Sequence, residues 1–204
     1  MGHRSYARKQ KEPGHSRIIT EAGMEFELQP TLTGSLLELR PLTPADFNAL
    51  FIAAGDPLIW EQHPQRDRYK REIFQKYFDS AMESKGALAA IDRKTSRIIG
   101  SSRYHNLQPQ REVEIGWTFL ERAYWGGTCN GELKALMVDH ALRFVRRVVF
   151  VVGETNLRSQ KALRKIGART VGKTERSLTG GIPLPHLIFA IERAERDAIT
   201  DPRP

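Results

Sequence analysis

An uninterrupted apolar run, Val148–Gly153, sets the strongest limit on how this chain folds. The run is far shorter than the roughly 20 apolar residues that a membrane-spanning helix needs. On either side of it, over about residues 132–146 and 156–166, apolar residues recur at helical spacing, and Gly167 is well placed to end the second helix. We therefore interpret the run as a buried strand between two amphipathic helices, and we expect no membrane-spanning segment.

The rest of the chain alternates between helix and strand patterns. Thr43 is the predicted N-cap of a first helix, with Pro44 at its first position, and Gly55 ends that helix. A second helix is predicted over residues 70–83. Strands are predicted over residues 36–40, 87–92, 97–105, 112–120, 148–152, 169–173 and 184–191. The resulting order, β-α-α-β-β-β-α-β-α-β-β, is that of an α/β (α+β) domain.

Length, composition and charge favour a single cytoplasmic domain. The 204 residues are 40% hydrophobic, which is enough for a sizeable core. Cys129 is the single cysteine, so a disulfide framework and a cysteine-clustered zinc site are excluded, and a reducing compartment is expected. We expect one domain over residues 24–204. The basic residues 1–23 are interpreted as a flexible tail, or as residues upstream of a natural start at Met24.

A glycine-rich segment, WGGTCNGE over residues 125–132, lies between a predicted strand and a predicted helix. Glycines there let the backbone bring several N–H groups to the helix N-terminus, where the helix dipole also favours an anion. The net charge of +8 likewise favours a polyanionic partner. A pyrophosphate fits both features, and a plain tight turn is the alternative. No Gly-Lys-Ser/Thr follows, so a nucleotide P-loop is excluded.

Four blocks together resemble the GCN5-related N-acetyltransferases (GNAT). They are LRPLTPAD at residues 39–46, VEIGWTFL at 113–120, the glycine-rich segment, and NLRSQKALRKIGA at 156–168, in the family's order and spacing. They are most similar to the branch that contains the ribosomal-protein N-terminal acetyltransferases. The resemblance covers about residues 36–191. It implies acetyl-CoA as the donor and a central mixed, mostly antiparallel sheet that splays near its middle and is flanked by helices.

The resemblance also implies which residues bind the donor. Strand 112–120 would line the pantetheine arm with backbone groups, and loop 126–131 would cradle the pyrophosphate. The residues expected to contact acetyl-CoA are Trp117, Thr118, Phe119, Arg122, Gly126, Gly127, Thr128, Cys129, Asn130, Gly131, Asn156, Arg158 and Ser159. Thr128 stands where the family usually has a second glycine. A β-branched residue disfavours positive φ, so the loop geometry is in question at this position.

Amine acetylation needs a base for the ammonium, polarisation of the thioester carbonyl and a proton for the departing thiolate. Glu114 is the predicted base, acting through water, and Glu112 points to the same side of its strand. The alternative is that one or both carboxylates are surface partners of arginines across strands. A backbone N–H near residues 117–119 is expected to polarise the carbonyl. Ser159 is predicted to protonate the thiolate, with helix capping by Asn156 and Ser159 as a compatible alternative.

The leading hypothesis is an N-acetyltransferase that moves the acetyl group of acetyl-CoA directly to a primary amine, either a protein N-terminus or a small amine. Two alternatives stay open: a catalytically inactive acyl-CoA-binding regulatory relative, and a basic ribosome- or RNA-associated protein. The acceptor site is expected within residues 56–71 and 175–186, and His63 is one candidate for its wall. The sequence does not select the amine. Neither a metal nor a nucleic acid is expected as a partner, and a homodimer through the last strands is one expected assembly.

Overall fold

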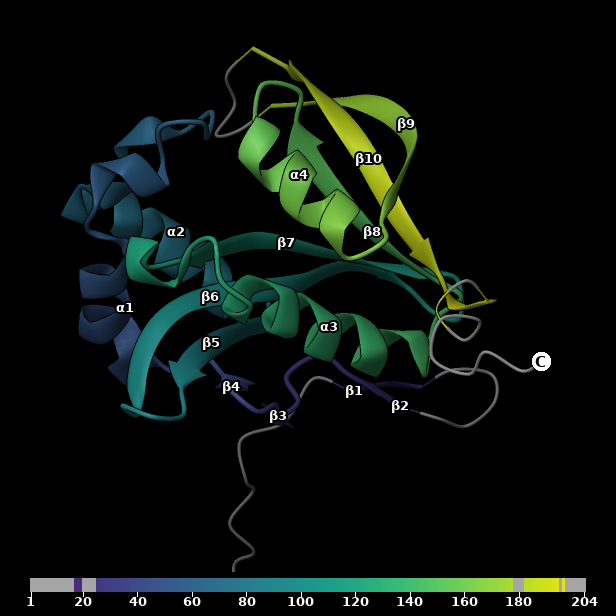
Figure 1. Cartoon of the computed structure of the whole chain (residues 1–204), viewed down its shortest axis with the longest axis horizontal. Helices are drawn as coiled ribbons and strands as arrows, with labels where there is room; N and C mark the ends of the chain where they lie inside the picture. Colours follow the sequence, from purple (N-terminus) through teal and green to yellow (C-terminus); the bar gives the residue numbers. More distant parts are fainter. Residues whose placement is uncertain (1–16, 20–24, 178–181, 195, 197–204) are drawn as a thin grey trace, which may run out of the picture.

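Eight strands form one sheet in the spatial order β3-β4-β5-β6-β7-β8-β10-β9 (Figure 1). The computed structural model describes residues 17–19, 25–177, 182–194 and 196. The strands of this sheet are β3 (Leu32–Thr33), β4 (Leu37–Pro41), β5 (Ala87–Asp92), β6 (Arg97–Gln108), β7 (Glu112–Leu120), β8 (Arg147–Gly153), β9 (Arg169–Arg176) and β10 (Leu184–Glu192). A separate pair joins β1 (Arg17–Ile19) to β2 (Glu25–Glu27).

Helices cover both faces of the sheet. The α-helices are α1 (Phe47–Ala54), α2 (Arg71–Glu83), α3 (Cys129–Leu142) and α4 (Leu157–Lys165), with 3-10 turns at Pro44–Asp46, Pro57–Ile59, Arg66–Tyr69 and Arg122–Tyr124. Strand β5 shows the layering, because its side chains alternate between the faces. Leu88 and Ala90 pack in the core that contains α3, whereas Ala87 and Ala89 pack against α1 and α2. The sheet is therefore the middle of three layers.

The sheet opens near its middle, between β7 and β8. These two strands are the parallel neighbours in an otherwise antiparallel sheet, and they pair only where Glu112–Glu114 faces Arg147–Val149. Beyond that point the strands diverge, as Figure 1 shows. Because β7 and β8 run in the same direction, the loops that lead into α3 and α4 both start at the open end. The architecture and the splay predicted from the resemblance are confirmed.

Differences from the predicted elements lie at their boundaries. Helix α3 begins at Cys129 instead of about residue 132, because the Glu132 N–H already donates to the Thr128 carbonyl at 2.9 Å. It ends at Leu142 instead of about residue 146, although the apolar pattern continues through tightened turns. Strands β6 and β9 each continue three residues further than predicted. Thr43 caps the 3-10 turn Pro44–Asp46 and not α1, whose N-cap is Asp46. The Asp46 carboxylate accepts from the Thr43 N–H at 2.8 Å and from its hydroxyl at 2.9 Å.

The short elements were not predicted, since strand β3 and the 3-10 turns are too short to show periodicity. The predicted flexible tail over residues 1–23 lies outside the described residues, except for β1. Within the described part of the chain, no helix is long and apolar enough to cross a membrane.

Candidate functional site

The glycine-rich segment turns into α3 with its backbone N–H groups free for a ligand. The first described helical hydrogen bond of this turn runs from the Glu132 N–H to Thr128, so the N–H groups of residues 129–131 precede it. The left-handed conformation falls on Gly126, with φ +74°, whereas Thr128 is in the helical region with φ −84°. The replacement of a family glycine by Thr128 therefore costs no backbone strain. A side chain atom added at Gly126, Gly127 or Gly131 would meet nothing within 4 Å, so this surface is open.

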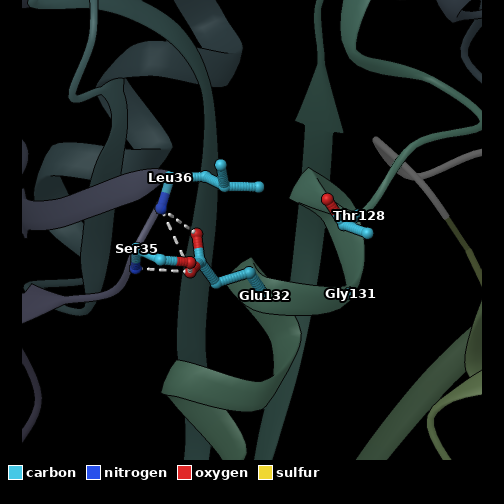
Figure 2. A pocket seen from close by; sticks show the side chains of 5 residues that line it. All are labelled: Ser35, Leu36, Thr128, Gly131 and Glu132. Carbon is cyan, nitrogen blue, oxygen red and sulfur yellow. Dashed lines mark hydrogen bonds between the residues drawn. The ribbon is translucent and has the colours of Figure 1, made fainter.

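Glu132, which the sequence interpretation left without a role, ties α3 to the turn before β4. Its carboxylate accepts from the Ser35 N–H and hydroxyl, each at 2.6 Å, and from the N–H groups of Leu36 and Leu37 at 2.9 Å. Figure 2 shows the side chain reaching from α3 toward Ser35 and Leu36. Burial raises the pKa of Glu132, but these hydrogen bonds outweigh it and hold the pKa below its ordinary value. The carboxylate stays ionised beside a cavity of about 550 Å³ that Thr128 and Gly131 also line.

The N-terminus of α4 is capped as the alternative interpretation proposed. The Asn156 side chain accepts from the Ser159 N–H at 3.1 Å, and Ser159 lies half-buried in the first turn. Capping leaves the Ser159 hydroxyl available. Its predicted roles in donor binding and thiolate protonation stay predictions.

Two of the cations expected around coenzyme A are bound to acidic side chains instead. The Arg122 guanidinium pairs with Asp56. Arg158 donates to Glu61 at 3.1 Å and to the Ile59 carbonyl at 2.9 Å, and its guanidinium lies 4.0 Å from the centre of the Trp125 ring. The Arg158 contacts hold the connection between α1 and α2 against the N-terminus of α4, and the Arg122 pair holds it against the turn that follows β7. A phosphate contact from either arginine requires that it leave its present partner.

Strand β7 carries a bulge at the position expected to face the thioester. The register with β6 shifts so that Ser101 faces Phe119 whereas Arg103 faces Gly116, and Trp117 between them has φ +52°. The Phe119 side chain is buried in the α1–α2 core, and the Thr118 hydroxyl lies 2.8 Å from that of Ser102. Both side chains thus have partners within the protein, and the predicted contacts of Thr118 and Phe119 with acetyl-CoA stay predictions.

Both candidate bases are paired with arginines, as the alternative interpretation proposed. Glu114 is 3% exposed and accepts from Arg176 at 2.8 and 2.7 Å, and from the Asn106 amide at 3.0 Å. Glu112 pairs with Arg147. These groups line a cavity of about 560 Å³ on the sheet face opposite α3, and its apolar lining comes from Leu107, Val149, Val151, Val171 and Ile188. Glu114 thus faces this cavity, with its carboxylate held by three hydrogen bonds.

Two buried arginines near α2 were missed by sequence reasoning. Arg103 is 2% exposed, with its guanidinium 4.7 Å from the Trp117 ring centre and 5.7 Å from that of Tyr77. Arg68 is 5% exposed and lies 4.9 Å from the centre of the same Tyr77 ring. Neither guanidinium has a carboxylate partner among the described residues. Burial lowers the pKa of both, that of Arg68 to about 10, so both remain cationic at neutral pH.

His63, the candidate for the acceptor wall, lies near Arg68. Its ring nitrogen Nδ1 accepts from the Gln65 N–H at 2.9 Å. Burial, and then the charge of Arg68, lower the pKa of His63 from 6.5 to about 3, so the imidazole is neutral at physiological pH. The neutral ring adds no further positive charge beside the arginine.

Nothing in the described residues supports metal or cysteine chemistry. No group of three or more metal-ligating side chains is present in these parts of the chain. Burial, followed by the charges of Glu132 and Asp92, raises the pKa of the Cys129 thiol. The thiol is therefore protonated at neutral pH, which makes it a weak nucleophile.

Comparison with known proteins identifies the family of this fold. The sequence model described as Acetyltransferase (GNAT) domain matches residues 37–169, and a search of curated protein sequences found no significant match. A GCN5-related N-acetyltransferase from Brucella melitensis has a TM-score of 0.75 at 19% identity, covering 90% of this chain and 84% of that one. Mycobacterium smegmatis RimJ in complex with CoA-disulfide has a TM-score of 0.58 at 20% identity, covering 80% and 88%.

A third solved structure is spermidine N-acetyltransferase from Vibrio cholerae in complex with CoA and spermine. Its TM-score is 0.61 at 12% identity, covering 79% of this chain and 98% of that one. At these identities the solved structures show a shared fold, whereas the family match spans more than half of the chain. This chain therefore belongs to the GNAT acetyltransferase family and is an acetyl-CoA-dependent acyltransferase.

Proposed function

We propose that this protein transfers the acetyl group of acetyl-CoA directly to a primary amine. The observation that carries the proposal is the opening between β7 and β8, which has the open glycine-rich turn of α3 at one end and the Glu114 cavity on its other side. Two structural neighbours, RimJ and the spermidine N-acetyltransferase, were solved with CoA ligands, and the latter with spermine as well. Both support a CoA-bound donor, and the second also supports an amine acceptor.

The residues at the opening fit the chemical parts of acetyl-CoA. The free N–H groups of residues 129–131 and the dipole of α3 suit the pyrophosphate. The edge of β7 beyond Glu114 does not pair with β8, so its backbone groups suit the amides of the pantetheine arm. Asn156 and Ser159 lie in the loop and first turn at the same end of the sheet. Acetyl-CoA itself supplies the activated acetyl thioester.

Proton movement is assigned to Glu114 and Ser159. The acceptor amine reaches the site as an ammonium and must lose a proton before it attacks. Glu114 receives that proton through water, on the condition that Arg176 or Asn106 gives up one of its hydrogen bonds to the carboxylate. Arg176 is the last residue of β9, beside the loop expected to contact the acceptor, so acceptor binding is placed to make this change. The Ser159 hydroxyl donates to the departing thiolate.

The experiment is acetyl-CoA-dependent thiol release against a panel of primary amines, with the variant Glu114→Gln. We expect kcat to fall by about 10²–10⁴, the usual contribution of a general base, with acetyl-CoA binding unchanged in a calorimetric titration. Glu121→Gln is the matched control, since Glu121 also pairs with an arginine, Arg97 at 2.8 Å, but lies outside the cavity. We expect it to keep wild-type turnover.

Each contrary result removes a different part of the proposal. Turnover that survives Glu114→Gln contradicts the role of Glu114 as the base but still supports the proposed acetyl transfer. Tight binding of acetyl-CoA without turnover of any amine favours a regulatory relative that binds acyl-CoA. Absence of acetyl-CoA binding contradicts the assignment of the glycine-rich turn to the pyrophosphate.

A further inference from the structure

Arg103 has an unused edge of its guanidinium group that matches a carboxylate. Its Nη1 donates to the Ser80 carbonyl and hydroxyl, each at 3.2 Å. Its Nε and Nη2 are buried and have no partner in the described structure. The N–H bonds of Nε and Nη2 point from the same edge of the planar group, which is the arrangement that holds both oxygens of one carboxylate. Buried donors are normally paired, so an edge without a described protein partner is suited to a bound anion.

Arg68 adds a second buried positive charge to the same place. The two guanidinium groups lie near the same Tyr77 ring, at 4.9 Å for Arg68 and 5.7 Å for Arg103. Arg68 has one described hydrogen bond, from Nε to the Gln65 side chain at 3.1 Å. Buried charges are usually paired with opposite charges. Two neighbouring arginines without a described carboxylate partner therefore concentrate positive charge inside the protein.

The ring of Trp117 lies against Arg103. Its centre is 4.7 Å from the guanidinium carbon, and it meets the His105 ring edge-on, with the two ring centres 4.8 Å apart. Trp117 has φ +52°, a conformation that a bulky residue rarely adopts, and it lies in the bulge of β7. Bulges re-aim side chains next to functional sites. The strained backbone here directs an indole ring against a buried arginine.

Arg103 is close to the strand on which acetyl transfer is proposed. Arg103 on β6 faces Gly116 on β7, and His105 on the same face of β6 is opposite Glu114. Neighbouring strands lie only about 5 Å apart. A small acceptor with its amine at the β7 edge can thus extend a second functional group toward Arg103.

We propose that Arg103, supported by the charge of Arg68, binds a carboxylate of the amine acceptor after the Trp117 ring moves aside. This inference rests on the proposed function, because it names the class of acceptor: an amine that also carries a carboxylate. A free amino acid offers its α-carboxylate, and a peptide with an acidic second residue offers a side-chain carboxylate. The amine end of either lies toward β7 and the acidic end lies between Trp117 and Tyr77.

The test compares acceptors that differ only in this charge. Free L-amino acids are assayed against their amino-acid amides, and Ser-Asp-amide against Ser-Asn-amide. We expect the carboxylate member of one pair to have at least a tenfold higher kcat/KM, mainly through a lower KM. The pair that responds distinguishes an α-carboxylate from a side-chain carboxylate. Equal kcat/KM within both pairs for the wild-type protein overturns the proposal, whatever the variants do.

Variants locate the preference at Arg103. Arg103→Met is expected to abolish the difference within the responding pair, and Arg103→Lys to retain part of it, with the KM for acetyl-CoA unchanged in both. Arg97→Met, on the same strand but in an exposed pair with Glu121, is the matched control and is expected to keep the full preference. A preference that survives Arg103→Met overturns the assignment to this arginine.

A binding measurement separates this inference from the proposed function. Tryptophan fluorescence of the protein with CoA is titrated with the carboxylate acceptor and with its amide. We expect a saturable change with the carboxylate alone, and its loss in Trp117→Phe. This change without any turnover supports the carboxylate site while the proposed transfer fails. Turnover without the change, or the same change with the amide, overturns the carboxylate site.

Discussion

Replacement of Lys134 by methionine is expected to stabilise the protein at neutral pH. Lys134 lies on α3 and is buried, and its ammonium is 5.2 Å from the centre of the Phe150 ring. Burial lowers the pKa of Lys134 from 10.5 to about 8. A tenfold change in proton affinity corresponds to about 1.4 kcal/mol, so the buried charge costs about 3 kcal/mol. The contact with Phe150 offsets about 1 kcal/mol, which leaves an expected gain of about 2 kcal/mol for Lys134→Met.

The sign of the pH dependence makes this prediction specific. Below pH 8 the lysine is charged in the folded and the unfolded chain, so the folded state carries the full cost. Between about pH 8 and 10.5 the unfolded chain binds the additional proton, and the stability of the wild-type protein therefore rises with pH. The advantage of Lys134→Met is expected to shrink across this interval. Other ionisable groups titrate in both proteins, so their contributions cancel in the difference in free energy of unfolding between the variant and the wild type.

Urea unfolding followed by circular dichroism at pH 7, 8.5 and 10 measures the difference in free energy of unfolding. Lys165→Met is the matched control, because Lys165 is exposed on α4 and its removal is expected to leave stability within about 0.5 kcal/mol. The reasoning is refuted by equal stability of Lys134→Met and wild type at pH 7. It is refuted equally by a gain that stays constant up to pH 10.

Two further substitutions test other groups of the site. His63→Asn keeps an acceptor for the Gln65 N–H but cannot be protonated. Burial and Arg68 lower the pKa of His63 from 6.5 to about 3, so the stability of the wild-type protein is expected to fall as the pH drops from 6.5 toward 3. The urea midpoint of the variant is expected to fall less over the same pH range. An equal fall of the urea midpoint with pH in the two proteins contradicts the lowered pKa of His63. Glu132→Gln loses the charge that binds the N–H groups of residues 35–37, so we expect a loss of about 1.5–3 kcal/mol and a melting temperature lower by about 3–12 °C in thermal unfolding. An unchanged melting temperature contradicts it.

Periodicity was sufficient to predict the order of the elements, because the helices and longer strands each bury a continuous apolar face. The end of α3 shows its limit: Phe144 and Val145 continue the apolar pattern into the core although the α-helix has ended at Leu142. The start of α3 shows another. Thr128 and the residues up to Glu132 show no apolar stripe, so periodicity does not predict a helix there. They still adopt helical geometry, because none of them is sterically excluded from a helical turn.

The site could be predicted only where it depends on local sequence. The glycine-rich turn at residues 126–131 and the Asn156 cap are such features, since neighbours along the chain form them. Pairs between distant residues carry no such signal. Glu114 and Arg176 are 62 positions apart, and the register of separate strands decides that they meet. The buried Arg103 lies in a stretch that alternates like any strand, and only the packing of α2 and Trp117 removes it from water.

The short parallel pairing of β7 with β8 joins two halves of the molecule. One half contains β3 to β7, and the other contains β8, β10, β9 and α4; across the opening, Arg158 joins them through Glu61 and the Trp125 ring. Both halves contribute to one hydrophobic core, which runs from β4 through α3 to β8, β10 and α4. Side-chain packing, more than strand pairing, therefore holds the two halves together. The space proposed for acetyl-CoA is thus an interruption of backbone hydrogen bonding and not of the core.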